Sequence, residues 1–338
     1  MKSRKKAPDP LFSSPASNPS IHNAQTERRS VPHDLDPKGP RRYVIIINRE
    51  ERPPSAGGGG QPFRLGEISV DPVVSEKLEH LKQNLAGLES ALVAFSGGVD
   101  STLLLKVASD NVPGPVVGAT LASCLSPPGE IVSAQALAER LGVEHVILDF
   151  DPLAVEALRA NPPDRCYHCK KTLIKLLKAE AEKQGLAAIL EGTNADDALS
   201  YRPGERAVIE GGLLSPLKEA GLTKAEVRAV ARGLGLPNWD RPALPCLATR
   251  FPYHTVLTEE AVRQVFQAEE VLLDLGLFGG RARSHGDILR LEFSPELMGR
   301  LLNEGLRKKL VERLKALGFR FVTLDLAGYQ SGVFDAAP

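Results

Sequence analysis

One stretch, ALVAFSGGVDSTLLL at residues 91–105, restricts the fold more than any other part of the chain. Its first half is a short apolar run typical of a buried strand, and its second half is typical of a helix. Between them stand Ser96, Gly97 and Gly98, which let the backbone turn sharply and expose its N–H groups. Because the positive end of the following helix points into the same space, the stretch predicts a phosphate cradle.

Side chains around this turn also suit phosphate. The hydroxyls of Ser96 and Ser101 add hydrogen-bond donors, and Asp100 stands where the helix begins. The loop lacks the lysine of the G-x-x-x-x-G-K-S/T pattern, which excludes that class of nucleotide loop. An ordinary strand-to-helix turn would need only one glycine, so the Gly97–Gly98 pair favours a binding role.

Strands alternate with helices on both sides of the turn. We expect strands at 91–95, 115–122, 144–150 and 186–194, and helices at 73–90, 100–110, 129–142, 171–185 and 223–235. This alternation predicts an α/β domain over residues 70–256, with a parallel sheet and helices on both faces. Helices at 258–276 and 295–318, alternating with strands at 288–293 and 320–326, predict a smaller α+β domain over residues 257–335.

The first 65 residues are rich in proline, basic residues and glycine, and we expect residues 1–65 to be mostly disordered. RRYVIIINRE, at residues 41–50, could form a strand but has no obvious partner. A targeting segment, or a start assigned too far upstream, would also explain this composition.

Composition limits the partners and the compartment. Lys+Arg and Asp+Glu both number 42, so no broad basic surface for nucleic acid is implied. No apolar run approaches membrane-spanning length, and no signal peptide opens the chain. The 4 cysteines form no disulfide framework, so we expect reduced thiols in a cytoplasmic protein.

PPDRCYHCKK, at residues 162–171, places Cys166 and Cys169 three positions apart, and PCLATRFPY adds Cys246. A redox dithiol would lie at a helix N-terminus, and this stretch directly precedes a predicted helix. Lys170 and Lys171 would lower the pKa values of its thiols.

Three other interpretations of the cysteines remain open. A zinc site could take His168 and Cys246 as nominal ligands, although His168 lies awkwardly between the other two. The thiols could be purely structural. Three thiolates could instead hold an iron–sulfur cubane and leave one iron open, which suits sulfide delivery.

Polar residues follow the predicted strand at 186–194. Asn194, Asp196, Asp197 and Arg202 would face the ligand crevice at the carboxyl edge of the sheet. Asp197 and Asp100 could hold Mg²⁺ against ATP phosphates, although an ordinary polar loop is the alternative.

Further basic residues come later in the chain. Arg250 lies on a proline-punctuated loop, and Arg281 and Arg283 stand just ahead of a strand, where they could bind a substrate phosphate. A solvated basic turn would explain them equally well. Glu269 and Glu270, in the middle of a predicted helix, could be exposed charges or carboxylates of a metal site. We expect Cys124 to be a small buried residue near the adenine pocket.

SGGVDS resembles the PP-loop of the N-type ATP pyrophosphatases. In order, the motifs AFSGGVDS, CYHCKK, EGTNADD, SPLKEAGLTKAEVR, PCLATRFPY, RARSHGDILRLEF and FVTLDLAGYQSG resemble the LarE family, over about residues 72–334. That family consists of ATP-dependent sulfur transferases for the nickel-pincer nucleotide cofactor, and the resemblance implies the PP-loop ATP pyrophosphatase fold.

The resemblance implies the chemistry and the ligands. ATP, with Mg²⁺, would adenylate the carboxylates of pyridinium-3,5-biscarboxylic acid mononucleotide in turn, and a sulfur nucleophile would displace AMP. ATP would contact Ser96, Gly97, Gly98, Asp100, Ser101, Asn194 and Asp197, and the substrate would contact Arg202, Arg250, Arg281 and Arg283. We also expect a homo-oligomer.

The family implies two sulfur sources. In one type, the cysteine matching Cys246 gives up its own sulfur and becomes dehydroalanine. In the other, Cys166, Cys169 and Cys246 would be the catalytic residues and would hold a 4Fe-4S cluster. Rival assignments are a tRNA-thiolating PP-loop enzyme, an ammonia-using ligase such as NAD synthetase, and a nucleotide-dependent iron–sulfur carrier.

Overall fold

The computed structural model describes residues 43–44, 71–199 and 203–330. The first sheet has the strand order β1-β4-β3-β2-β5. Four strands are parallel, namely β2 (Ala91–Ala94), β3 (Val116–Ala122), β4 (Glu144–Asp149) and β5 (Ala188–Leu190). β1 (Tyr43–Val44) pairs antiparallel with β4, so the N-terminal strand does have a partner. The rest of residues 1–65 lies outside the described part of the chain.

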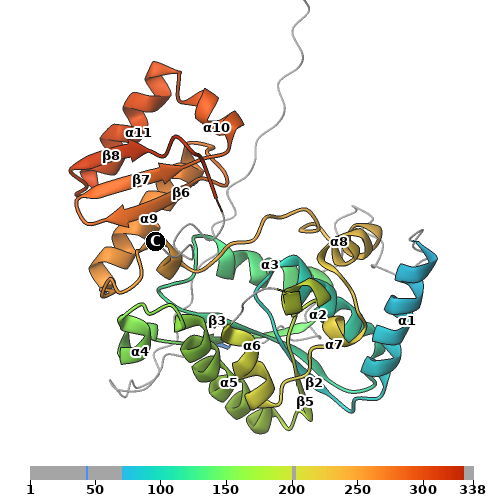
Figure 1. The fold of residues 1–338 in the computed structure, drawn as a ribbon. Helices are drawn as coiled ribbons and strands as arrows, with labels where there is room; N and C mark the ends of the chain where they lie inside the picture. Colours follow the sequence, from blue (N-terminus) through green and yellow to red (C-terminus); the bar gives the residue numbers. More distant parts are fainter. Residues whose placement is uncertain (1–42, 45–70, 200–202, 331–338) are drawn as a thin grey trace, which may run out of the picture. The chain divides into compact units, whose positions relative to one another are not determined.

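Helices cover both faces of this sheet (Figure 1), as predicted. Val93 of β2 packs in a cluster with α1 (Pro72–Ala86), α2 (Val99–Asn111), α3 (Glu130–Leu141), α7 (Pro216–Glu219) and α8 (Lys224–Gly233). Leu92, on the opposite face, packs against α5 (Arg165–Gln184) and α6 (Pro203–Gly211). No helix in the described residues is long and apolar enough to cross a membrane.

A second sheet, of order β6-β7-β8, follows in the chain. It consists of β6 (Arg281–His285), β7 (Ile288–Glu292) and β8 (Phe321–Leu324), with α9 (Glu259–Asp274), α10 (Pro295–Arg300) and α11 (Glu304–Ala316). β6 runs antiparallel and β8 parallel to β7. This sheet has its own hydrophobic cluster, although the division into domains at residue 257 stays a prediction.

Two local predictions for this region were wrong. Residues 281–285 are themselves a strand of a hairpin, rather than a turn ahead of one. The basic side chains of Arg281 and Arg283 on a buried face concealed the strand pattern. The helix predicted over 295–318 is two helices, because the chain breaks before Asn303, whose side chain caps α11.

A buried ion pair joins the segment after α8 to α9. Arg250 is 0% exposed and ends the short 3-10 helix η3 (Leu247–Arg250). Its Nε lies 2.6 Å from Glu269 Oε1, and its Nη2 lies 3.1 Å from Glu269 Oε2. Such a bidentate pair stabilises only while both partners are present, because either charge alone would be stranded in the interior.

A second buried polar group, His145 on β4, lies beside the end of β2. The Thr120 hydroxyl donates to the Phe95 carbonyl, so His145 Nε2, 2.7 Å from Thr120 Oγ1, must donate to that hydroxyl. Burial lowers the pKa of His145 from its usual 6.5 to about 4. The folded protein therefore holds this imidazole neutral.

We predict that replacing Glu269 by Gln lowers the free energy of unfolding by about 3–5 kcal/mol, because Arg250 keeps a buried charge without a carboxylate. The double variant Arg250→Met/Glu269→Leu should recover most of that loss in urea titrations. Exposed Glu270, the next residue on α9, provides the control, and Glu270→Gln should change stability by less than about 0.5 kcal/mol. Equal effects of the two single substitutions would contradict the assignment.

Acid should destabilise the protein partly through His145. Its depressed pKa contributes stability that is fully present above pH 6.5 and is lost as the pH falls toward 4. Between about pH 8 and pH 5 the loss from this one group is about 2 kcal/mol. His145→Gln keeps a donor but cannot titrate, so its unfolding free energy should fall less over that range. Parallel pH profiles of the two proteins would contradict this.

Candidate functional site

The predicted phosphate turn joins β2 to α2. Gly97 has φ of 73°, and a Cβ there would approach Ala134 to 3.2 Å, so both conformation and space require glycine. Gly98 is the N-cap residue of α2 and offers no side chain to the first N–H groups of that helix. The N-terminus of α2 is therefore left for an external anion, as a phosphate cradle requires.

The two serines of the turn shape the loop. Ser96 Oγ lies 3.2 Å from Ser101 Oγ and accepts a bond from the Gly98 N–H at 3.3 Å. Ser101 Oγ donates to the Gly98 carbonyl at 3.1 Å. Asn238, buried and distant in the sequence, donates to the Gly97 carbonyl and to Thr102 Oγ1, each at 2.9 Å. These bonds fix the turn before any ligand arrives, and sequence reasoning missed Asn238.

Three residues predicted at the nucleotide site come together beside this turn. Asn194 Nδ2 donates to Asp100 Oδ1 at 3.2 Å, and the Asn194 N–H donates to Asp197 Oδ2 at 3.1 Å. Lys224, at the start of α8, forms an ion pair with Asp100 Oδ2. Its backbone N–H also donates to Asp196 at 2.8 Å. Lys224 was missed, although it directly follows Thr223, which was predicted as a helix cap.

A buried carboxylate connects this region to the cysteine helix. Glu191, which follows β5, accepts from Lys170 Nζ at 2.9 Å and from Ser215 Oγ at 2.6 Å. Burial raises the pKa of Glu191, but Lys170 and the hydrogen bonds together outweigh burial. The net pKa therefore lies below the usual value. The next residue, Gly192, packs so closely on α2 that a Cβ would lie 3.0 Å from Ser101 N.

The three predicted cysteine ligands come from two segments. Cys166 and Cys169 lie in the first turns of α5, and Cys246 is the N-cap residue of η3. Burial, then the thiols of Cys246 and Cys166, raise the pKa of Cys169 to about 12, and Lys170 lowers it only in part. Both other thiols therefore act electrostatically on Cys169.

The pKa of Cys169 corrects one expectation, and the three thiols can be compared with the ligands that a metal cluster needs. The predicted lowering of the thiol pKa by Lys170 and Lys171 is wrong for Cys169, because burial and the other thiols outweigh the positive charge. Among the described residues no three His, Cys, Asp or Glu side chains are arranged to hold a metal ion. The donor set of three thiols still suits an iron–sulfur cubane chemically, since iron would displace the thiol protons and its positive charge would offset the repulsion between the thiolates.

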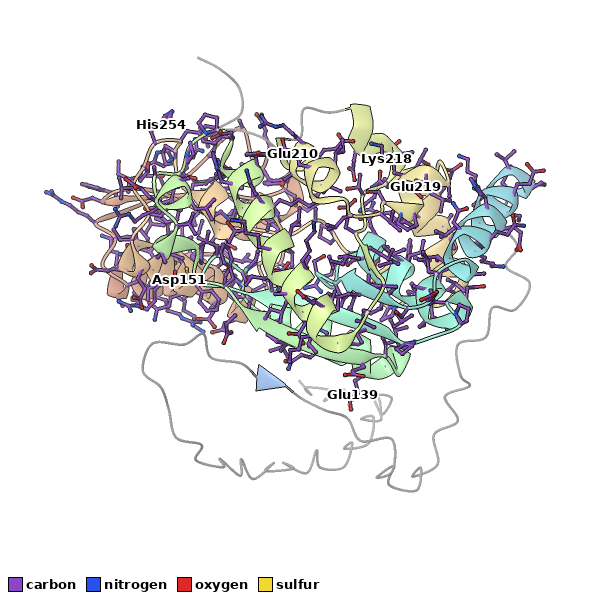
Figure 2. All side chains as sticks on the ribbon, turned by 90° about the horizontal axis from the view of Figure 1, so that it is seen from below. Glu139, Asp151, Glu210, Lys218, Glu219 and His254 are labelled. Atoms are coloured by element: carbon purple, nitrogen blue, oxygen red, sulfur yellow. The ribbon has the colours of Figure 1, made fainter. Side chains whose placement is uncertain are left out.

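The fourth cysteine lies at a different place. Cys124 is exposed, which contradicts the buried position predicted for it. It lines a pocket of about 1050 Å³ beyond the ends of β3 and β4, together with Asp149, Asp151 and Arg159 (Figure 2, where Asp151 is labelled). The pocket lies at the carboxyl edge of the parallel strands, where open α/β sheets bind ligands.

The arginines predicted for substrate have internal partners here. Arg283 forms a bidentate pair with Glu292, at 2.9 and 2.8 Å, and Arg250 pairs with Glu269. Arg281 donates to the carbonyls of Gly279, Gly280 and Ala243. Their substrate role therefore stays a prediction. Arg202 lies outside the described residues.

Comparison with known proteins places this geometry in a family. Residues 81–211 match the asparagine synthase family. A pyridinium-3,5-bisthiocarboxylic acid mononucleotide synthase from Lactiplantibacillus plantarum is 41% identical over 249 residues, which cover 73% of this chain and 90% of that protein. An uncharacterized protein from Synechocystis is 42% identical, over 77% of this chain and 97% of its own length.

A more distant relative is named as a thiouridylase. The tRNA-specific 2-thiouridylase MnmA from Caulobacter vibrioides is 29% identical, over 49% of this chain and 54% of that protein. The nucleotide turn and the extended similarity to the Lactiplantibacillus enzyme together identify the chain as a PP-loop enzyme that belongs to the LarE family.

Proposed function

We propose that the protein is an ATP-dependent sulfur transferase that acts on pyridinium-3,5-biscarboxylic acid mononucleotide. A substrate carboxylate oxygen attacks the α-phosphorus of ATP and releases pyrophosphate, which gives an acyl adenylate. A sulfur nucleophile then adds to the acyl carbon, and AMP leaves with the electron pair of the broken C–O bond. The observation that carries the proposal is the proximity of three thiols in a chain that also builds a PP-loop.

The nucleotide would bind at the turn between β2 and α2. The N–H groups of α2 and of the turn would hold phosphate oxygens, and Asp100 with Asp197 would hold Mg²⁺ against them. Mg²⁺ commonly takes one or two carboxylates and completes its shell with phosphate and water. Lys224 would exchange Asp100 for a phosphate oxygen, since the metal ion then takes the carboxylate.

Cys166, Cys169 and Cys246 would hold a 4Fe-4S cluster. When bound, the cluster supplies an iron without a protein ligand, where sulfide can be carried. The chain's own task is to keep three thiolates together on two segments. The ion pair of Lys170 with Glu191 and the pair of Arg250 with Glu269 hold those segments in place.

Other features of the proposal concern partners and compartment. We propose that the enzyme works in the cytoplasm as a homo-oligomer, on a small nucleotide substrate. The balanced charge of the chain, 42 basic and 42 acidic residues, disfavours a tRNA substrate.

The proposal is tested by anaerobic reconstitution with iron and sulfide, followed by assay with ATP, Mg²⁺ and the biscarboxylate nucleotide. We expect release of AMP and pyrophosphate, with a substrate mass increase that matches replacement of oxygen by sulfur. If this substrate elicits no AMP, the assignment of the reaction is wrong.

Lys224→Met should lower the rate of AMP release by about 100-fold, because a charge at the nucleotide phosphates is lost. The quantity to measure is the single-turnover rate at saturating ATP. Lys82→Met removes an ion pair with Glu79 on α1 and serves as the control, with an unchanged rate. Equal rates for Lys224→Met and the wild type would remove this lysine from the nucleotide site.

Cys166→Ala should abolish multiple turnover, because two thiolates do not retain the cluster, whereas adenylation of the substrate continues. Iron content after reconstitution and thiocarboxylate formed per enzyme are the two measurements. Cys124→Ala, a cysteine outside the group of three, should behave as the wild type in both. Undiminished multiple turnover by the Cys166 variant would refute the cluster role.

A further inference from the structure

Arg165, the first residue of α5, stands directly before Cys166 and is nine-tenths buried, with 8% of its surface exposed. No hydrogen-bond partner for its Nε or Nη1 exists among the described residues. Buried arginines normally have partners, as Arg250 and Arg283 do in this protein. A guanidinium with two unmatched donors therefore indicates a missing negative ligand.

No carboxylate pairs with Arg165 among the described residues. The first turn of α5 carries no acidic residue, and the side chain of Asp164 does not cap the helix. Asp164 instead contacts His168 at 3.1 Å. The positive end of a twenty-residue helix and a buried cation thus meet at a place where the adjacent carboxylate, Asp164, binds neither of them.

The position of the guanidinium connects it to the cysteines. Its central carbon lies 4.5 Å from the centre of the Tyr253 ring, in the segment that follows η3 and Cys246. Arg165 and Cys169 are four residues apart on α5, so they share a face of that helix. The cation on the helix of Cys166 and Cys169 therefore contacts the segment that follows Cys246.

The same segments have a constrained backbone. Asn161 and His254 have φ values of 49° and 63°, which non-glycine residues rarely adopt, and the His254 N–H donates to the Asn161 carbonyl at 3.0 Å. His254, next to Tyr253, is exposed (Figure 2). The bond between His254 and Asn161 ties the segment that carries Tyr253 to the stretch just before α5.

We propose that Arg165 is the counter-charge of the cysteine site, a positioning residue that attracts and holds a small sulfur anion, such as hydrosulfide, beside Cys166 and Cys169. This role of Arg165 rests on the proposed function, in which a sulfur anion reaches the cysteines and replaces the sulfur that was transferred to the substrate. The assignment itself concerns the metal-free chain and needs neither ATP nor iron.

The test compares two alkylating reagents on the full-length, reduced, metal-free protein. Iodoacetate is an anion and iodoacetamide is neutral, and both react with the thiolate, so the ratio of their rates cancels the thiolate fraction and reports the local charge. Peptide mass spectrometry follows Cys166, with exposed Cys124 as an internal reference in the same molecule.

Arg165→Met should lower the iodoacetate-to-iodoacetamide ratio at Cys166 by about threefold to tenfold and leave the ratio at Cys124 unchanged. Arg165→Lys should retain most of the wild-type ratio, because it keeps the charge. Lys171→Met removes an equal charge from an exposed position of the same helix and should have less than half that effect.

An unchanged ratio in folded Arg165→Met would overturn the proposal. If that variant does not fold, as judged by circular dichroism, Arg165→Gln and the salt dependence of the wild-type ratio at Cys166 decide instead. A ratio at Cys166 that is no higher than at Cys124 in the wild type would equally contradict the assignment. Absence of sulfur transfer by the wild-type enzyme, with the charge effect at Cys166 present, would count against the proposed function alone.

Discussion

The buried pair of Arg250 with Glu269 fixes Cys246, the one of the three predicted cysteine ligands that lies outside α5. Cys246 precedes a single turn of 3-10 helix, and such a short element holds no position by itself. Arg250 ties the far end of that turn to α9, and Arg283 Nη1 donates to the carbonyl of Thr249. The second sheet, which has its own hydrophobic cluster, thereby supports the proposed cysteine site.

The proposed nucleotide site and the proposed cysteine site share a short stretch of backbone after β5. Glu191 binds the lysine next to Cys169, Gly192 packs on α2, and Asn194 binds Asp100. Four consecutive residues, 191–194, thus connect the helix of Cys166 and Cys169 to the phosphate loop. A reaction that first activates an oxygen with ATP and then delivers sulfur needs both groups within reach of one substrate, and this stretch provides the connection.

Much of the fold could be predicted from local pattern, because β2, α2 and their neighbours have clear periodicity and a glycine turn with a physical purpose. The strand β6 was missed because its buried face carries two arginines: Arg283 pairs with Glu292, and Arg281 donates to backbone carbonyls. Asn238 and Lys224 were missed for a related reason. Each is an ordinary polar residue until the fold brings it to the phosphate turn.

The cysteines also show that local sequence does not determine how a residue behaves in the folded protein. Spacing alone favoured a redox dithiol with lowered pKa values, and neighbouring lysines supported that view. In the folded protein Cys169 is partly buried and the other two thiols act on it, so its pKa rises instead.

The central claim is that the three cysteines act together to deliver sulfur that is not their own. The most direct test is the intact mass of the enzyme after several turnovers, with the thiocarboxylate formed per chain measured in the same sample. The account predicts more than one sulfur transferred per chain and an unaltered Cys246. Conversion of Cys246 to dehydroalanine, with no more than one sulfur transferred, would contradict it.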